Sequence, residues 1–127
     1  MRFHTFHHVI NKLLNKSENN ICMFESRPAK YRFGVKNYGD IKKWINKADG
    51  DPWDVFAPGY DHYFTRNKEY TISKVIGIFI LENGNHKIAV RIKDAPIVST
   101  TFEKSQIKKY MNEYSKYTKI NGYFVKI

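Results

Sequence analysis

The chain has 127 residues, a formal net charge of +10 and one cysteine. This length suits one domain with one hydrophobic core, which we place over residues 1–127. The lone Cys22 excludes an intrachain disulfide, and no stretch approaches the roughly 18 apolar residues of a membrane-spanning helix. The N-terminus Met1–His4 lacks the apolar region of a signal peptide, so we expect a cytoplasmic protein with no membrane partner.

Residues 3–16 predict an amphipathic helix, because their apolar side chains recur at intervals of three and four residues: Phe3, Phe6, Ile10, Leu13 and Leu14. Residues 1–20 would thus form an N-terminal helical extension. His4 and His8 would share one face of this helix. No acidic or cysteine partner accompanies them, which favours surface histidines over a metal pair.

Strands are expected at residues 21–24 and 30–35, joined by a proline-containing turn. Asp40 is then expected to cap a short helix that runs through Trp44 and Ile45. This helix would lead into a strongly acidic loop.

The second half of the chain predicts a series of strands, at residues 53–57, 70–81, 86–92 and 122–127. Residues 70–81 are almost wholly apolar in their second half, which should be buried on both faces. Asn83–Asn85 is a tight hairpin signal that joins this strand to the next.

A C-terminal helix is expected to begin with a capping box formed by Thr100 and Glu103. Its apolar stripe would consist of Ile107, Tyr110, Met111, Tyr114 and Tyr117. Short strands followed by one helix indicate an α+β, mainly β protein. We expect a small OB-like β-barrel with this C-terminal helix and an extra N-terminal helix.

The segment Asp49-Gly50-Asp51-Pro52-Trp53-Asp54-Val55 places three carboxylates within six residues. Like charges this close oppose one another's ionisation, unless a cation lies among them. Hard cations such as Mg²⁺ take oxygen ligands of this kind. An acidic surface turn is the alternative, since Asp and Gly are ordinary turn residues. Trp53 excludes an EF-hand loop, because it stands where such a loop needs a ligand.

This acidic motif resembles the D-G-D-P-x-D-V signature of the soluble (family I) inorganic pyrophosphatases. Further segments match the family in the same order, from about residue 21 to the C-terminus: Pro28–Tyr31, Asn37–Ile41, Val75–Ile78, Gln106–Ile107 and Tyr114. The resemblance implies an OB-like barrel and a Mg²⁺-dependent hydrolase, with Mn²⁺ as a possible replacement for Mg²⁺. The reaction would convert diphosphate and water into two phosphates, or cleave a related phosphoanhydride.

The resemblance also implies roles for individual residues. Asp49 and Asp54 match the carboxylates that hold the activating metal. Asp51 matches a metal-site residue that orients or deprotonates the attacking water, and acts in catalysis with Lys30 and Tyr38. By the same resemblance, substrate phosphates would contact Lys30, Tyr38 and Tyr114. Arg32, His86 and Lys116 do not match the family's pattern at their own positions, but their positive charges could add contacts to the phosphates. His86 stands near the family's loop lysine, and Lys87 adds a further cation.

Several positions depart from the family. Ile21 and Arg32 stand where it has glutamates, and the hairpin Asn83–Asn85 is too short for its second metal loop. A site with fewer metals and more cations would turn over more slowly. The alternative function is therefore a catalytically impaired, pyrophosphatase-fold binding module for nucleic acid or a nucleotide. A third is an interaction protein that docks through its N-terminal helix, and a homo-oligomer is compatible with each.

The positive charge has two interpretations, which the sequence leaves open. A basic surface suits a polyanionic partner, either nucleic acid or a phosphate-bearing small molecule. Alternatively, an AT-rich coding sequence favours Lys, Asn and Ile wherever the fold tolerates them. The lysines are scattered along the chain rather than gathered in one long run.

Overall fold

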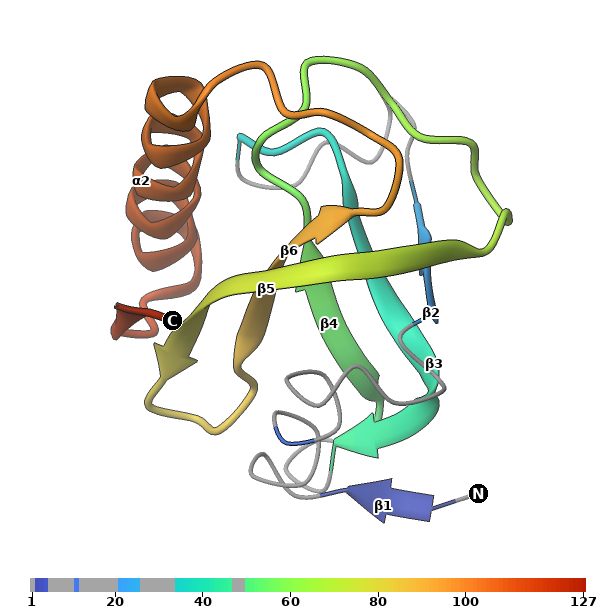
Figure 1. Ribbon diagram of the computed structural model, residues 1–127. Coiled ribbons are helices and arrows are strands. Elements are labelled where there is room, and N and C mark those ends of the chain that lie inside the picture. The colour runs from blue at the N-terminus through green and yellow to red at the C-terminus, as the bar shows by residue number, and fades with distance from the viewer. Residues whose placement is uncertain (1, 5–10, 12–20, 26–33, 47–49) are drawn as a thin grey trace.

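The computed structural model describes residues 2–4, 11, 21–25, 34–46 and 50–127 (Figure 1). Within these ranges lie helix α2 (Thr100–Thr118) and the strands β1 (Arg2–His4), β2 (Ile21–Phe24), β3 (Tyr38–Asn46), β4 (Pro52–Phe56), β5 (Tyr70–Leu81), β6 (Lys87–Ile92) and β7 (Gly122–Lys126). The strands predicted from residues 21, 53, 70, 86 and 122 are thus confirmed to within one residue at each end. In Figure 1, α2 stands beside the strands rather than across their ends.

Five of the strands close into a barrel. Around the ring the order is β3-β2-β5-β6-β4, and pairing of β4 with β3 completes it. β4 and β6 run parallel, whereas the other neighbours in the ring are antiparallel. β1 adds to β3 and β7 adds to β5. The expected mainly β, OB-like barrel with a C-terminal helix is confirmed.

Two groups of buried side chains stabilise this arrangement. The group inside the barrel includes Phe24, Trp53, Val55, Ile88 and Val90. The group between the outer surface of the barrel and α2 includes Phe56, Phe79, Ala89, Tyr110 and Tyr114. Neighbouring residues of β4 and β6 fall into different groups, because side chains alternate between the faces of a strand. For the same reason the second half of β5 is buried on both faces, as predicted.

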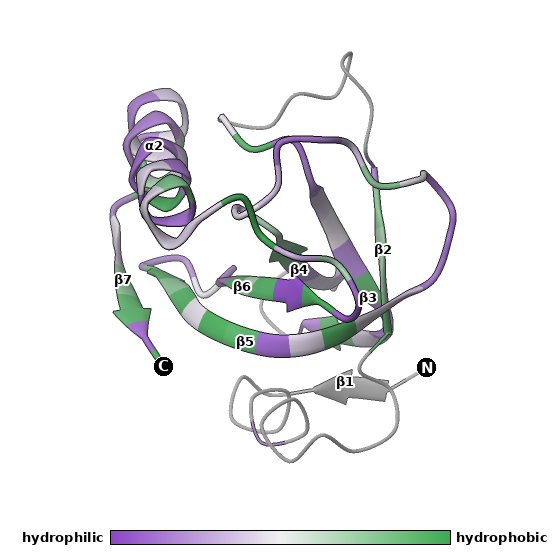
Figure 2. Ribbon diagram, turned by 45° about the horizontal axis from the view of Figure 1, so that its top comes forward, coloured by the Kyte–Doolittle hydropathy of each residue, from purple (hydrophilic) through white to green (hydrophobic). Residues whose placement is uncertain are grey.

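Helix α2 is largely polar, while green apolar residues concentrate on the strands (Figure 2). Among the described residues, none of the helices combines the length and apolar character that crossing a bilayer requires. Along α2, burial is confined to one stripe with Tyr110 and Tyr114, and Tyr117 at its predicted end is exposed.

The first turn of α2 differs from the prediction. Ser99 caps the helix, and its hydroxyl accepts a hydrogen bond from the Phe102 N–H at 3.0 Å. The predicted capping box of Thr100 and Glu103 is therefore wrong. Glu103 is buried and accepts two hydrogen bonds from the Arg91 guanidinium of β6, at 2.9 and 2.8 Å. A buried carboxylate needs such a partner, so this ion pair fixes the start of α2 on the barrel.

The predicted short helix from Asp40 through Ile45 is wrong, because these residues belong to β3. The register of β3 on β4 shifts between Ile41 and Ile45. At this irregularity the buried Ile41 and Trp44 are separated by two exposed lysines. An interrupted strand therefore shows the three-residue spacing that normally indicates a helix.

The predicted helix over residues 3–16 is wrong at its start, because Arg2–His4 forms β1, parallel to β3. Asn11 is helical, and the rest of the predicted helix lies outside the described residues. Most of the strand predicted over residues 30–35 also lies outside them. Gly34, which is described, lies in a turn with φ 92°.

The segment that leads into β3 has a clear architectural role. Asn37 is fully buried; its side-chain N–H donates to the His62 carbonyl at 2.8 Å, and its Oδ1 accepts from the Phe64 N–H at 2.9 Å. Gly39 lies so close to β2 that a Cβ there would overlap the Met23 carbonyl oxygen. Both residues thus hold neighbouring backbone in place.

Replacing Tyr110 with alanine should lower the free energy of unfolding by about 3–5 kcal/mol, the usual loss for a buried aromatic side chain. Tyr110 is fully buried, and its ring stacks on Phe56 with ring centres 4.5 Å apart. Urea unfolding would measure the change. The control is Tyr117→Ala on the same helix, where the side chain is 67% exposed and the expected change is below about 0.5 kcal/mol. Equal losses would contradict this packing of α2.

Candidate functional site

Three charged side chains lie side by side across β3, β4 and β6. Asp40 is paired with Asp54 in the antiparallel register of β3 and β4, and Asp54 with Lys87 in the parallel register of β4 and β6. Residues paired in this way project from the same face of the sheet. We call Asp40, Asp54 and Lys87 the charged row. It lies on the outer face, because Phe56, two residues after Asp54, packs against Tyr110 of α2.

Lys87 is the most deeply buried member of the charged row. Its side chain is 4% exposed, and its ammonium forms an ion pair with Asp54 Oδ2 at 2.5 Å. The ammonium also lies 5.8 Å from the ring centres of both Tyr38 and Tyr114, within the range of cation–π attraction. A buried ammonium is unfavourable without such partners. Asp54, with its side chain 20% exposed, is the more accessible partner of the pair.

A layer of tyrosine rings covers Lys87. Tyr38 stacks with Tyr110, and Tyr110 stacks with Tyr114, at centre distances of 6.4 and 6.0 Å. Tyr114 also meets the edge of Phe79 at 5.6 Å. Because Tyr110 and Tyr114 lie one helical turn apart on α2, the packing of the helix sets the position of the Tyr114 ring over the ammonium.

The structure therefore brings together three of the predicted site residues, namely Tyr38, Asp54 and Tyr114. They come from β3, β4 and α2, and they meet at Lys87. In the sequence comparison, His86 stands near the family's loop lysine, and Lys87 is only an additional cation. The alternation along β6 was the signal for Lys87, because Ile88, Val90 and Ile92 are the apolar inward positions.

His86 makes different contacts. Its Nδ1 accepts a hydrogen bond from the Leu81 N–H at 2.9 Å, and its ring centre lies 6.3 Å from that of Trp53. Burial lowers the pKa of the imidazole, and the charge of Lys87 lowers it further. His86 therefore supports the hairpin between β5 and β6, while its neighbour Lys87 belongs to the charged row.

Two other predicted site residues, Asp51 and Lys116, are described and make contacts of their own. Asp51 is exposed at the start of the β4 hairpin, where its carbonyl accepts the Asn46 N–H at 2.7 Å. Lys116 is exposed, and its ammonium lies 5.6 Å from the ring centre of the exposed Tyr117. The other three lie outside the described residues: Lys30, Arg32 and Asp49.

Asp40 is the carboxylate whose ionisation its surroundings oppose. Burial raises its pKa, and the negative charges of Asp54 and Glu25 also act in this direction, whereas Lys42 lowers it. The Lys42 ammonium lies 3.3 and 3.4 Å from the two carboxylate oxygens, but the Lys42 side chain is 60% exposed. Water screens such an exposed partner, so Asp40 is held in a net unfavourable setting for its charge.

The acidic motif can offer oxygen ligands to Mg²⁺ or Mn²⁺. Carboxylate oxygens are the preferred ligands of these ions, and the described part of the motif supplies Asp51 and Asp54. Within the ranges given above, no three His, Cys, Asp or Glu side chains lie close enough to hold a metal ion. Mg²⁺ often takes only one or two carboxylates when water and substrate phosphates complete its shell. The donor chemistry thus fits an ion that is bound together with a phosphate ligand.

Neither the models of known protein families nor the curated proteins include a match to this chain. The resemblance to soluble inorganic pyrophosphatases therefore rests on the acidic motif and the other short sequence segments named above. The contacts around Lys87 are a separate observation, because they come from the geometry of β3, β4, β6 and α2.

Replacing Lys87 with methionine should lower the free energy of unfolding by about 3–5 kcal/mol, because Asp54 would keep an uncompensated charge. The double variant Lys87→Met, Asp54→Leu should recover much of this loss, since it leaves no unpaired charge. Urea unfolding of both single variants and the double variant gives the coupling energy. Additive losses would mean that the ion pair is not formed in solution.

The raised pKa of Asp40 predicts a pH dependence of stability. Between the ordinary value of 3.8 and the raised folded value, the folded state binds more protons than the unfolded state. The contribution of Asp40 to the stability of the wild type should therefore fall as pH rises through this window. Asp40→Asn removes the effect, so its stability relative to wild type should increase over the same window in urea unfolding from pH 3 to 7.

Lys42→Met supplies the second arm of this test. Its ammonium opposes the rise in the Asp40 pKa, so its removal should widen the pH window and steepen the loss of stability. A pH profile that is the same in wild type, Asp40→Asn and Lys42→Met would show that Asp40 titrates normally in the folded protein.

Proposed function

We propose that this chain is a pyrophosphatase-like hydrolase that cleaves a phosphoanhydride, either inorganic diphosphate or a related compound, with Mg²⁺ or Mn²⁺. One observation carries the proposal: Tyr38, Asp54 and Tyr114, which match the family's site by motif alone, surround the ammonium of Lys87. The three lie far apart in the chain, so their convergence is not a consequence of local sequence.

Hydrolysis of a phosphoanhydride requires neutralised phosphate charge, an aligned water and a stabilised leaving phosphate. Lys87 supplies a positive charge beside the substrate, and Lys30 and Arg32 would add to it. Tyr38 and Tyr114 donate hydrogen bonds to phosphate oxygens, while Asp51 orients the water and accepts its proton. Mg²⁺ on Asp49, Asp51 and Asp54 would contribute charge neutralisation and a lowered pKa of bound water.

In the Lys87–Asp54 ion pair, the Asp54 carboxylate would compete with a substrate phosphate for the Lys87 ammonium. Each member neutralises the other, so the pair is stable beneath the tyrosine layer without a ligand. A phosphate beside Lys87 would compete with Asp54 for the ammonium, because lysine binds phosphate as a point charge. The Asp54 carboxylate would then need another cation. Substrate phosphate and divalent cation should therefore bind with positive cooperativity.

A second candidate function is binding of a phosphate-bearing ligand without turnover. The same ion pair favours this binding function, since Lys87 already neutralises the Asp54 carboxylate, which a catalytic metal would need as a ligand. In this case Lys87 holds the phosphate of a nucleotide, and the basic surface of the protein extends the contact to nucleic acid. The two candidates differ in their need for metal and in the release of phosphate.

Phosphate release from diphosphate with Mg²⁺ or Mn²⁺ tests the proposal. Asp51→Asn should lower kcat by about 10²–10⁴, the usual contribution of a general base, and leave diphosphate binding nearly unchanged. Lys30→Ala should instead weaken binding, because a point-charge contact exists before the transition state as well as in it. The control is Asp61→Asn: its side chain is 69% exposed outside the acidic motif, and its removal should leave kcat unchanged.

The outcomes separate the two candidates. Release of phosphate that Asp51→Asn abolishes supports the hydrolase. If neither diphosphate, nucleoside triphosphates nor dinucleoside polyphosphates are cleaved with either metal, the hydrolase is wrong. Calorimetry that then finds metal-independent binding of diphosphate or a nucleotide supports the binding module, and the absence of any binding overturns both.

A further inference from the structure

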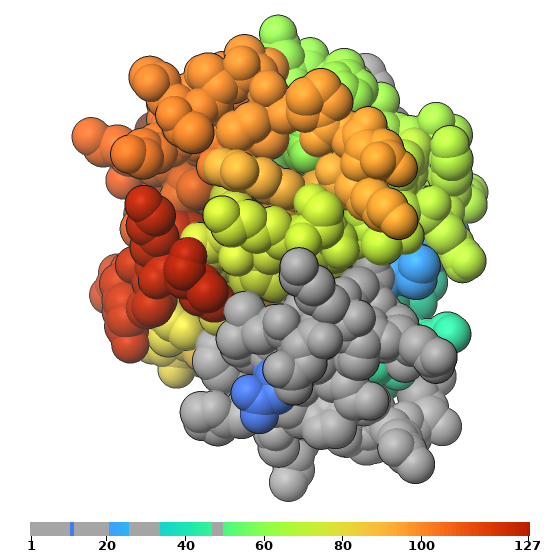
Figure 3. All heavy atoms as spheres, viewed as in Figure 1, coloured from blue at the N-terminus to red at the C-terminus, as the bar shows by residue number. Residues whose placement is uncertain are grey.

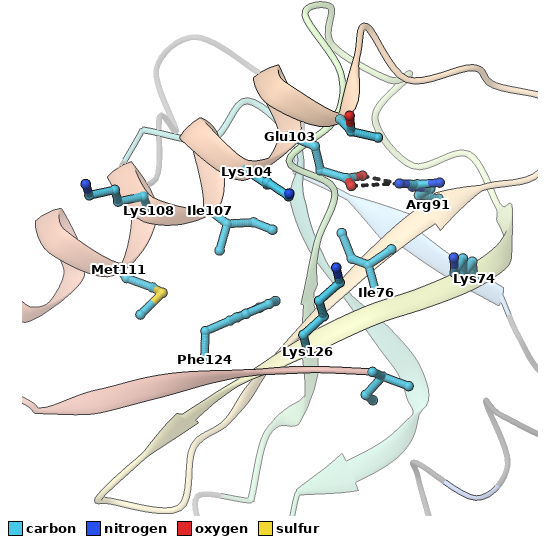
Figure 4. Close-up of a pocket in the computed structure, with 12 residues that line it drawn as sticks. Lys74, Ile76, Arg91, Glu103, Lys104, Ile107, Lys108, Met111, Phe124 and Lys126 are labelled. Carbon is cyan, nitrogen blue, oxygen red and sulfur yellow. Dashed lines mark hydrogen bonds and ion pairs between the residues drawn. The ribbon is translucent and has the colours of Figure 1, made fainter.

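A pocket of about 420 Å³ opens between α2 and the strands β5 and β7 (Figure 4). None of its lining residues belongs to the charged row or to the acidic motif. Its floor and walls are apolar, formed by Ile76, Ile107, Met111 and Phe124. Pockets of this size hold small organic ligands, which they contact mainly through apolar side chains.

Positive charge surrounds this apolar surface. The lining includes Lys74, Lys104, Lys108, Lys126 and Arg91. Arg91 is neutralised by Glu103. None of the four lysines forms an ion pair with a carboxylate in the part of the chain that the structure describes. The pocket therefore combines an apolar interior with four ammonium groups that have no carboxylate partner among the described residues.

Two of the lysines lie so that both ammonium groups could bind the same group of a ligand. In Figure 4, Lys104 from α2 and Lys126 from β7 reach toward the pocket from opposite walls, whereas Lys108 points away from it. Figure 3 shows orange residues around the start of α2, yellow-green residues of β5 and red residues of β7 next to one another on one face of the molecule. Residues of all three of these elements line the pocket.

We propose that this pocket binds a phosphate monoester with an apolar alkyl or aryl body. The body packs on Ile107, Met111 and Phe124, and the phosphate lies between Lys104 and Lys126. A monoester carries a charge close to −2 at neutral pH, which two ammonium groups match better than they match a single carboxylate. Met111 adapts to ligands of different shape, because its thioether chain is flexible.

Other polyanions fit the pocket less well. The edges of a nucleic-acid base need hydrogen-bond partners, and the apolar side chains of the floor and walls offer none. Inorganic phosphate would leave the apolar surface exposed to water, and the hydrophobic contribution to binding would be lost. The proposal is independent of the proposed hydrolase, since the two sites share no residue.

Titration calorimetry of the whole chain with octyl phosphate tests this proposal. Octyl phosphate should bind more tightly than octanol, octanoate or inorganic phosphate, because only it has both the dianionic head and the apolar body. The double variant Lys104→Gln, Lys126→Gln should weaken binding about tenfold or more. Met111→Gln should also weaken it, without any change in charge.

The matched control is the double variant Lys68→Gln, Lys93→Gln, which removes two exposed lysines outside the pocket and should leave the affinity unchanged. Asp51→Asn should also bind octyl phosphate normally, so the hydrolase and this site can fail separately. Equal weakening by both double variants would show a diffuse electrostatic effect and overturn the proposal. So would octanol or inorganic phosphate binding as tightly as octyl phosphate.

Discussion

The ammonium of Lys87 sets the constraint on which this structure depends. A positive charge that is nearly removed from water must have an anion at contact distance, and Asp54 provides it only because β4 and β6 pair in parallel register. The aromatic rings of Tyr38 and Tyr114 close the site from β3 and α2. Barrel closure, helix docking and burial of charge are therefore mutually dependent, and a change in any of them exposes or isolates the ion pair.

Much of the fold could be predicted from the sequence, because most strands show the simple signals of their kind. β5 has a long apolar run, and the turn after it is marked by Asn83–Asn85. The failures have local physical causes. β3 carries an irregularity that gives Ile41 and Trp44 helical spacing. Glu103 pairs with Arg91 of β6, and the sequence around Glu103 does not indicate this partner. Long-range pairing thus overrode local pattern at both places.

The candidate site was partly predictable for a different reason. Tyr38, Asp54 and Tyr114 were identified through motif matches, and the geometry places them together. Lys87 was harder to identify, because a shortened hairpin leaves two adjacent basic residues as candidates for one position. Only the alternation of side chains along β6 decides between them, because a shift of one residue moves every side chain to the opposite face of the sheet. Lys30, Arg32 and Asp49 lie outside the described residues, so their matches remain predictions.

The side-chain amide of Asn37 has a consequence for how a family likeness should be weighed. It satisfies two backbone groups of the 62–64 loop, and no apolar residue could replace both hydrogen bonds. A chain without any phosphate chemistry would still gain stability from this asparagine, because the same two backbone groups would need partners. The presence of Asn37 is therefore evidence for a shared fold and not for a shared reaction. The ring of Tyr38, one position later, instead faces the ammonium of Lys87, which a substrate phosphate would bind.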